Sequence, residues 1–260
     1  MKIYILCDLE GTAGVVDFQK QTYPDGKYHE EAKRLATLEV NAVVEGALEG
    51  GATEIVVLDG HGPGGLSIEE MHPGARWLLG RPIPSPWRFG SEYDALFLYG
   101  HHSMAGTECG VLSHSWSSRA IANCWLNGEL IGEIGANCAL AGHFGRPTVF
   151  ISGDRAAVEE ARRYVPGIEG VVVKEGVSRT AALSLAPARA REELRAGARR
   201  AMGRIGEIAP YRIAPPYVFR TQYLSWELAE NAARRPGAKR VDLFTVEIES
   251  DDLVDLLARR

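Results

Sequence analysis

The chain has 260 residues, of which 45% are apolar and 24% charged, a composition typical of a soluble globular protein that can build a substantial core. Its formal net charge of −5 and isoelectric point near 5.9 provide no basic surface for nucleic acid. No apolar run approaches the roughly 18 residues of a membrane span and no secretory signal precedes the first predicted strand, so we expect a cytoplasmic protein with neither nucleic acid nor membrane as partner.

Short apolar runs alternate with helical patterns through the first part of the chain. The patterns predict strands over residues 3–7, 55–58, 95–99 and 147–151, a short helix near 68–71, longer helices over 29–49 and 134–142, and a hairpin of 121–126 with 129–131. Continuous apolar runs of this kind are typical of parallel strands buried on both faces. The alternation therefore predicts an α/β fold with a mainly parallel sheet flanked by helices.

The character of the sequence changes near residue 155. Arg-, Glu- and Ala-rich patterns predict helices over 155–164 and 187–205 around a short strand at 171–174. A strand, a helix, a second strand and a final helix are then predicted over 217–221, 225–234, 241–248 and 251–258. We expect a catalytic α/β domain over residues 1–155 and a smaller C-terminal α+β subdomain over residues 156–260.

Potential metal ligands follow three of the predicted strands. Asp8 and Glu10 come after the first strand, and side chains two residues apart in an extended chain point the same way. His61 follows the second strand and His101-His102 the third, where adjacent side chains diverge and only one is expected to reach the site. Ligands bind beyond the carboxyl ends of parallel strands, so we expect the residues that follow these three strands to form one metal site. Each motif alone would equally fit a helix cap or a structural histidine.

Two further residues are candidates with open alternatives. Glu133 begins a segment of small apolar residues and is either a metal ligand or a solvated helix start. His114 lies in a Gly- and Ser-rich stretch, where it could be a general base, a substrate clamp or a packed loop histidine. The sequence contains no G-x-S-x-G elbow, P-loop, G-x-G-x-x-G or HExxH motif, which leaves serine hydrolase and nucleotide-binding functions unsupported.

A set of motifs spread over nearly the whole chain carries a family resemblance. The set comprises Asp8-Leu9-Glu10-Gly11, Asp59-Gly60-His61, Gly100-His101-His102-Ser103-Met104-Ala105-Gly106-Thr107, Leu112-Ser113-His114-Ser115, Gly132-Glu133, Ile151-Ser152-Gly153-Asp154 and Val177-Ser178-Arg179-Thr180. Together these motifs resemble the zinc-dependent D-aminopeptidases of the DppA type, peptidase family M55.

The resemblance implies a function and a site. It implies two zinc ions per chain held by Asp8, Glu10, His61, His102 and Glu133, with Asp8 as the bridge and His114 as the catalytic residue. His101 then takes the position of an aromatic residue in the family motif. The expected substrates are short D-amino-acid-containing peptides or amides, and the expected assembly is a homo-oligomer, a decamer in the family.

Two other functions remain open from the residues alone. The same carboxylates and imidazoles could serve a two-metal phosphoesterase, with Arg88 or Arg119 holding the phosphate. They could also bind metal only to stabilise a non-catalytic peptide-binding protein, which needs no catalytic histidine.

Overall fold

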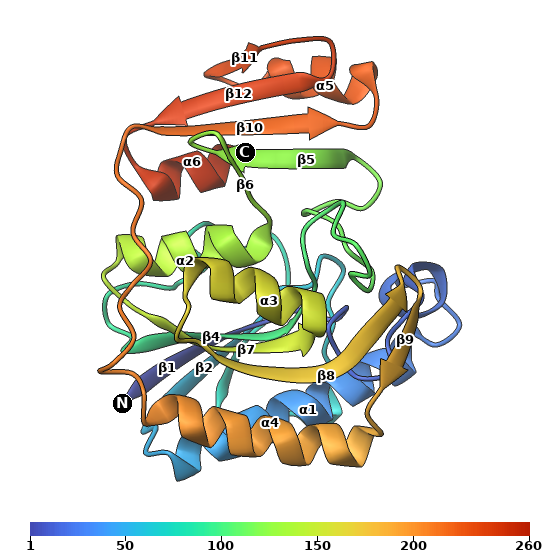
Figure 1. The fold of residues 1–260 in the computed structure, drawn as a ribbon, viewed down its shortest axis with the longest axis vertical. Helices are drawn as coiled ribbons and strands as arrows, with labels where there is room; N and C mark the ends of the chain where they lie inside the picture. Colours follow the sequence, from blue (N-terminus) through green and yellow to red (C-terminus); the bar gives the residue numbers. More distant parts are fainter.

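The computed structural model describes residues 1–260 and arranges their strands in two sheets (Figure 1). Sheet A has the order β3-β2-β1-β4-β7-β8-β9, and its pairings are parallel except that of β8 with β9. Its strands are β1 Lys2–Cys7, β2 Glu54–Asp59, β3 Arg76–Leu78, β4 Ala95–His101, β7 Thr148–Asp154, β8 Glu169–Ser178 and β9 Ala181–Ser184. The predicted mainly parallel sheet is confirmed.

Helices cover both faces of sheet A. In Figure 1, α1 (His29–Glu49) and α4 (Pro187–Met202) lie side by side on one face, and α2 (Glu133–His143) and α3 (Arg155–Tyr164) lie on the other. Every residue of β4 and β7 is buried, as expected for a sheet covered on both sides. None of the helices combines the length and apolar character that crossing a membrane requires.

Sheet B is antiparallel and has the order β11-β12-β10-β5-β6. Its strands are β5 Ile121–Leu126, β6 Glu129–Leu130, β10 Tyr217–Tyr223, β11 Ala238–Arg240 and β12 Thr245–Ser250. Two helices pack on it, α5 Trp226–Ala233 and α6 Leu253–Arg259. The predicted hairpin is confirmed, with Asn127 and Gly128 both at positive φ in its turn. Helix α6 lies between this sheet and α2 (Figure 1).

The two sheets interleave along the chain. Strand β5 pairs with β10 and β6 in sheet B. Strands β8 and β9 belong to sheet A, and α4 packs on that sheet, although all three come later in the sequence than β5 and β6. The smaller C-terminal α+β part is confirmed as strands β10 to β12 with α5 and α6. The division of the chain near residue 155 stays a prediction.

One predicted strand was misplaced. The strand expected over 241–248 begins at Thr245, and the prediction was wrong because residues 241–244 form a tight turn. Within this turn the Asp242 carboxylate accepts a hydrogen bond of 2.8 Å from the Phe244 amide, so the side chain competes with strand pairing. The two short helices η1 (Phe18–Thr22) and η2 (Ile68–Glu70) complete the element list, and η2 matches the predicted short helix.

A buried carboxyl group under the loop that follows β1 gives a testable prediction. Glu39 accepts hydrogen bonds from the Tyr99 hydroxyl (2.9 Å) and the Ala13 amide (3.2 Å). Burial raises its pKa from 4.5 to about 7, so the folded protein retains a proton that the unfolded chain releases within that range. The stability contributed by this protonated group is therefore lost as pH rises from about 4.5 to 7.

Replacing Glu39 with glutamine should remove this pH dependence. We expect the fall in unfolding free energy between pH 4.5 and 7 to shrink by about 3 kcal/mol in Glu39→Gln, measured by urea denaturation at several pH values. An unchanged slope in that range would show that Glu39 is ionised in the folded protein.

Candidate metal centre

The candidate site lies where the strand order of sheet A reverses. Strand β1 has β2 on one side and β4 on the other, and the segments that follow these three strands carry Asp8, His61 and His102. Open α/β sheets bind ligands at such a switch point, beyond the carboxyl ends of the strands. The topology therefore brings the three predicted motifs to one location.

A glycine allows two of these segments to approach closely. Gly100, at the end of β4, has a φ of +67°, and a Cβ atom built on it would overlap the carbonyl oxygen of Asp8. The backbones are joined by hydrogen bonds from Asp8 N to Tyr99 O (2.8 Å) and from Gly11 N to Gly100 O (2.6 Å). A side chain at position 100 would push Asp8 away from the segment that carries His102.

The first group of ligand atoms consists of Asp8, Glu10 and His61, all buried. The Nδ1 atom of His61 lies 3.2 Å from Asp8 Oδ1 and 3.1 Å from Glu10 Oε2. Its Nε2 atom lies 2.8 Å from the carbonyl oxygen of Thr22, which can only accept, so Nε2 carries a proton. This contact orients the ring and leaves Nδ1 to face the two carboxylates.

The second group consists of His102, His114 and Glu133. The Nε2 atom of His102 lies 3.4 Å from Glu133 Oε1 and 3.2 Å from Asp8 Oδ2. Its Nδ1 atom lies 3.0 Å from the carbonyl oxygen of Ser103, so this ring is also oriented by its backbone. Asp8 therefore touches both groups, with one carboxylate oxygen directed at each.

The charges within the two groups depend on one another. Burial disfavours the charged imidazoles, but the neighbouring carboxylates Asp8, Glu10 and Glu133 raise the pKa values of His61 and His102 well above the usual range. Burial likewise opposes ionisation of Glu133, yet its contact with His102 lowers the pKa of Glu133 to about 2. The carboxylates thus require positive charge beside them, which either protons or a cation can supply.

The donor set fits zinc. Glu10 Oε2 and His102 Nε2, one atom in each group, are buried and make no well-directed hydrogen bond, although His61 Nδ1 lies 3.1 Å from the first and Asp8 Oδ2 lies 3.2 Å from the second. Buried polar atoms without partners are rare in folded proteins and call for a ligand or ion. Carboxylate oxygens and neutral imidazole nitrogens held by backbone carbonyls are typical zinc ligands.

The adjacent histidines have different environments. His101 is buried outside both groups, with Nδ1 3.1 Å from the carbonyl oxygen of Tyr99, and burial lowers its pKa. His102 faces Asp8 and Glu133. Of the two neighbours, His102 is the one directed into the candidate site, because adjacent side chains at the end of β4 diverge.

His114 stacks on His102, with ring centroids 3.8 Å apart. Its Nδ1 atom lies 2.8 Å from the carbonyl oxygen of Leu112 and carries the proton, which leaves Nε2 without one. Burial and repulsion from His102 lower the pKa of His114, so its ring is neutral near pH 7. A neutral, oriented imidazole next to a group of metal-ligand side chains can accept and return a proton.

Helix α2 supplies Glu133 from its first turn. A carboxylate is favoured there by the dipole of the helix, and Gly132 precedes it as the N-cap. The Oε1 atom of Glu133 also accepts a hydrogen bond of 2.7 Å from the Trp116 amide, which fixes the loop carrying His114 against the helix.

A buried lysine that the sequence analysis did not single out holds the loop after β1. The Nζ atom of Lys174 donates to the carbonyl oxygens of Glu10, Thr12 and Val15, and burial lowers its pKa to about 8. The apolar run 171–173, which leads directly into Lys174 in strand β8, was the available signal, because a buried ammonium group needs several acceptors.

Lys174→Met should therefore destabilise the fold and weaken metal binding. Methionine fills a similar volume but leaves the buried carbonyl groups of Glu10 and Val15 without a donor, while Thr12 O keeps the Val15 amide, and we expect a loss of about 3 kcal/mol or more in urea denaturation. Zinc affinity should fall as well, because Glu10 belongs to the released loop. The exposed pair formed by Lys2 and Glu54 offers the control Lys2→Met, which should change neither quantity. Unchanged stability in Lys174→Met would contradict this role.

A cavity of about 310 Å³ opens over the two groups and is lined by Asp8, Glu10, His61, His114 and Glu133 among others. Arg119 lines the same cavity and stacks over the ring of Tyr23, 4.0 Å from its centroid. Arg88 instead lines a separate cavity with Glu54, at the amino end of β2. Of the two arginines considered as phosphate ligands, only Arg119 borders the candidate metal centre.

Comparisons with known proteins bear on the family and the fold. The sequence profile of peptidase family M55, described as D-aminopeptidase, matches residues 1–259. A D-aminopeptidase of Bacillus subtilis (strain 168) is 29% identical over 262 residues, covering 98% of this chain and 93% of its own. The solved structure of the Zn-dependent D-aminopeptidase DppA from Bacillus subtilis, described as a self-compartmentalizing protease, superposes with a TM-score of 0.93 at 27% identity, covering 100% of this chain and 95% of its own.

Proposed function

The chain belongs to peptidase family M55, the D-aminopeptidases, and on that premise we propose that it is a binuclear zinc-dependent aminopeptidase acting on short D-amino-acid-containing peptides or amides. Asp8, Glu10, His61, His102 and Glu133 hold the two ions, and His114 is the catalytic residue. The observation that carries the proposal is the position of Asp8, whose Oδ1 and Oδ2 atoms lie 3.2 Å from His61 and 3.2 Å from His102 respectively.

The residues of this chain have different roles in the proposed hydrolysis. Zinc, when bound, supplies a water of lowered pKa and polarises the carbonyl group of the substrate. Asp8 holds the two halves of the site together, and the backbone carbonyls of Thr22 and Ser103 keep His61 and His102 in orientation. His114, with Nε2 free of a proton, accepts a proton and returns it to the leaving amine.

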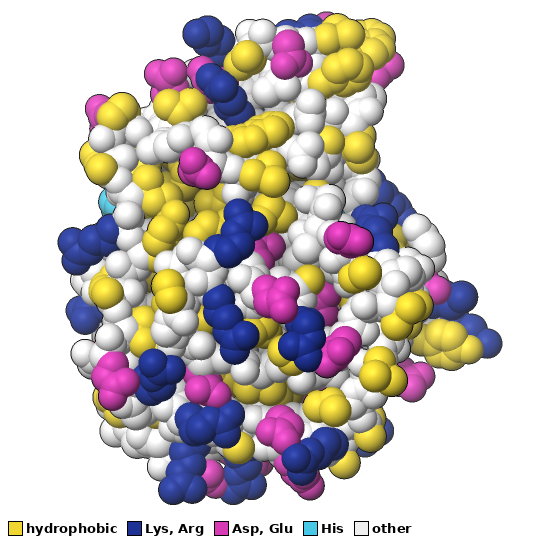
Figure 2. Space-filling view, viewed as in Figure 1, with side chains coloured by type: hydrophobic (Ala, Val, Ile, Leu, Met, Phe, Trp, Pro, Cys, Tyr) yellow, Lys and Arg dark blue, Asp and Glu magenta, His cyan; other side chains and the backbone are white.

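We also propose a homo-oligomer in the cytoplasm, with a decamer expected from the family resemblance. Exposed apolar side chains around the end of sheet B support a subunit contact there: Leu224, Trp226, Val241, Leu243 and Phe244. Figure 2 shows apolar side chains gathered at this end of the molecule, over α5. Patches of this kind are typical of contacts between subunits.

The proposed activity is tested by hydrolysis of D-alanine p-nitroanilide and its L-isomer. We expect p-nitroaniline to be released from the D-isomer. The activity should be lost when a chelator is added and should recover on addition of zinc. Hydrolysis of p-nitrophenyl phosphate but of neither anilide would favour the phosphoesterase with Arg119 at the phosphate. Peptide binding without turnover of any substrate would favour the binding protein.

A further inference from the structure

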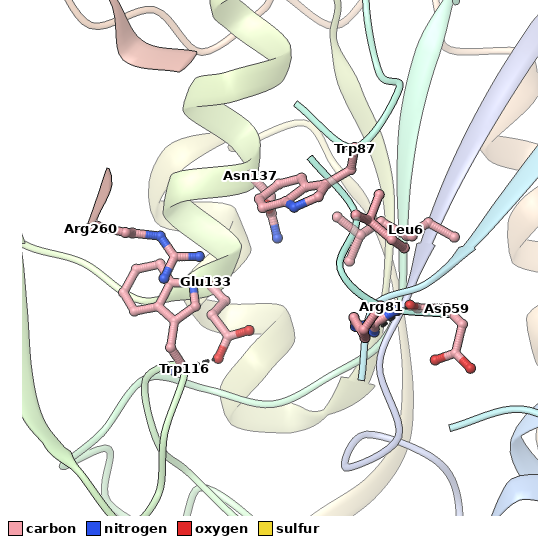
Figure 3. A pocket seen from close by; sticks show the side chains of 11 residues that line it. Leu6, Asp59, Arg81, Trp87, Trp116, Glu133, Asn137 and Arg260 are labelled. Atoms are coloured by element: carbon pink, nitrogen blue, oxygen red, sulfur yellow. Dashed lines mark hydrogen bonds between the residues drawn. The ribbon is translucent and has the colours of Figure 1, made fainter. Parts of the chain in front are cut away.

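An arginine of the C-terminal region reaches the candidate metal centre from the side of sheet B. Arg260 follows α6, whose start is capped by the Asp252 carboxylate through hydrogen bonds to the Val254 and Asp255 amides. Its guanidinium group stacks over the ring of Trp116, 4.1 Å from the centroid. Figure 3 shows Arg260, Trp116 and Glu133 close together.

The charge of Arg260 is not matched by a carboxylate. No carboxylate oxygen lies within 4.0 Å of its guanidinium group, and its Nε atom is buried without a hydrogen-bond partner. Arg259, its neighbour, shows the usual arrangement, because it donates to Asp255 at 2.6 Å on the surface. Burial lowers the pKa of Arg260 to about 10, and the group remains charged at neutral pH. Arg260 is half-buried, and an unpaired guanidinium group whose Nε atom is buried favours an anion beside it.

Arg260 lies at one end of a cavity of about 180 Å³, and Asp59 and Arg81 lie at the other (Figure 3). The apolar part of the wall between them is formed by Leu6, Leu58, Ile83, Trp87 and Trp116. It shares Gly60, Trp116 and Glu133 with the cavity over the metal ligands, so the two cavities adjoin at Glu133. A substrate held at the metal groups can therefore extend past Glu133 toward Arg260.

A second unpaired arginine strengthens the positive charge on that side. Arg235 and Arg260 both line a further cavity with Thr221 and Tyr223, and no carboxylate oxygen lies within 4.0 Å of Arg235 either. The guanidinium groups repel each other, which contributes to the lowered pKa of Arg260. An anion next to Arg260 would relieve both the repulsion and the cost of burial.

We propose that this cavity, called here the leaving-group pocket, receives the residue on the carboxyl side of the cleaved bond, and that Arg260 binds its terminal carboxylate. The proposal rests on the proposed aminopeptidase function. Apolar walls suit a small side chain, and the planar guanidinium group suits a carboxylate through two parallel hydrogen bonds. The pocket thus selects dipeptides, whose carboxylate follows one residue after the cleaved bond, over peptide amides and anilides.

The test compares D-alanyl-D-alanine with its C-terminal amide. Calorimetric titration of the metal-free wild-type protein should show the dipeptide binding about tenfold or more tightly than the amide, since a charge-assisted contact is lost in the amide. Arg260→Gln should abolish this difference, and Arg259→Gln, the matched control, should retain it. Equal binding of dipeptide and amide to the wild-type protein, or no measurable binding of either, would overturn the proposal.

Kinetics of the zinc-loaded protein give a second readout. In Arg260→Gln the ratio of kcat/KM for the dipeptide to kcat/KM for D-alanine p-nitroanilide should fall about tenfold, because only the dipeptide carries the carboxylate. A parallel loss for both substrates would mean that Arg260 only supports the fold, and would overturn the proposal. If wild-type protein hydrolyses no substrate, the proposed aminopeptidase function fails, while the binding comparison still decides the role of Arg260.

Discussion

Replacing Asp8 with asparagine is expected to lower hydrolysis at least about a thousandfold, which corresponds to about 4 kcal/mol of transition-state stabilisation. One carboxylate oxygen of Asp8 faces His61 and the other faces His102, at 3.2 Å in each case. An asparagine offers one oxygen and an NH2 group that repels a cation, so at least one ion loses its ligand. Removing this single side chain should therefore disturb both metal groups.

The metal content of purified Asp8→Asn, measured by mass spectrometry after zinc reconstitution, distinguishes this effect from misfolding. We expect fewer than two zinc ions per chain together with a folded far-UV spectrum. Glu39→Gln replaces another buried carboxylate outside both groups and serves as the matched control, with full metal content expected. Retention of two ions and of activity in Asp8→Asn would refute the bridging role.

Replacing His114 with alanine should lower kcat by about 10²- to 10⁴-fold, the usual contribution of a general acid or base. The structure gives His114 two possible roles, because its ring stacks on His102 and it also belongs to the second group of ligand atoms. The lowered pKa of His114 and its proton-free Nε2 suit either role, and the proposed function assigns His114 to proton transfer. Metal content should therefore remain at the wild-type level.

For His114→Ala, the zinc content and the kcat are to be measured on the same preparation. Two zinc ions with a reduced kcat and an unchanged KM would support a role in proton transfer. Loss of an ion together with activity would show instead that His114 is a ligand of the second group. Full activity would exclude both roles.

The sequence located the strand ends of sheet A because their signals are local. The apolar runs before Asp8, His61 and His102 are continuous, and each ends abruptly in a polar motif. A parallel sheet then brings such ends together regardless of how the remainder of the chain folds. For this reason Asp8, Glu10, His61 and the pair His101-His102 could be named from the strand ends, whereas the roles of Glu133 and His114 and the choice of His102 came from the family resemblance.

Other features depend on contacts between distant segments, and local patterns could not reveal them. The pairing of β5 with β10 joins residues almost one hundred positions apart. Lys174 bonds the carbonyl groups of a loop that is far away in sequence, and Arg260 reaches Trp116 from the end of α6. In the sequence each stands beside another charged residue, Glu175 and Arg259 respectively, and only their contacts in the folded protein distinguish them from surface side chains.

We propose that two zinc ions bind on either side of Asp8. Anomalous-difference maps from crystals of the zinc-loaded protein, recorded at the zinc absorption edge, locate the ions. We expect two separate peaks per chain, one between Asp8, Glu10 and His61 and the other between Asp8, His102 and Glu133. A single peak, or peaks at other residues, would contradict the binuclear centre proposed for this protein.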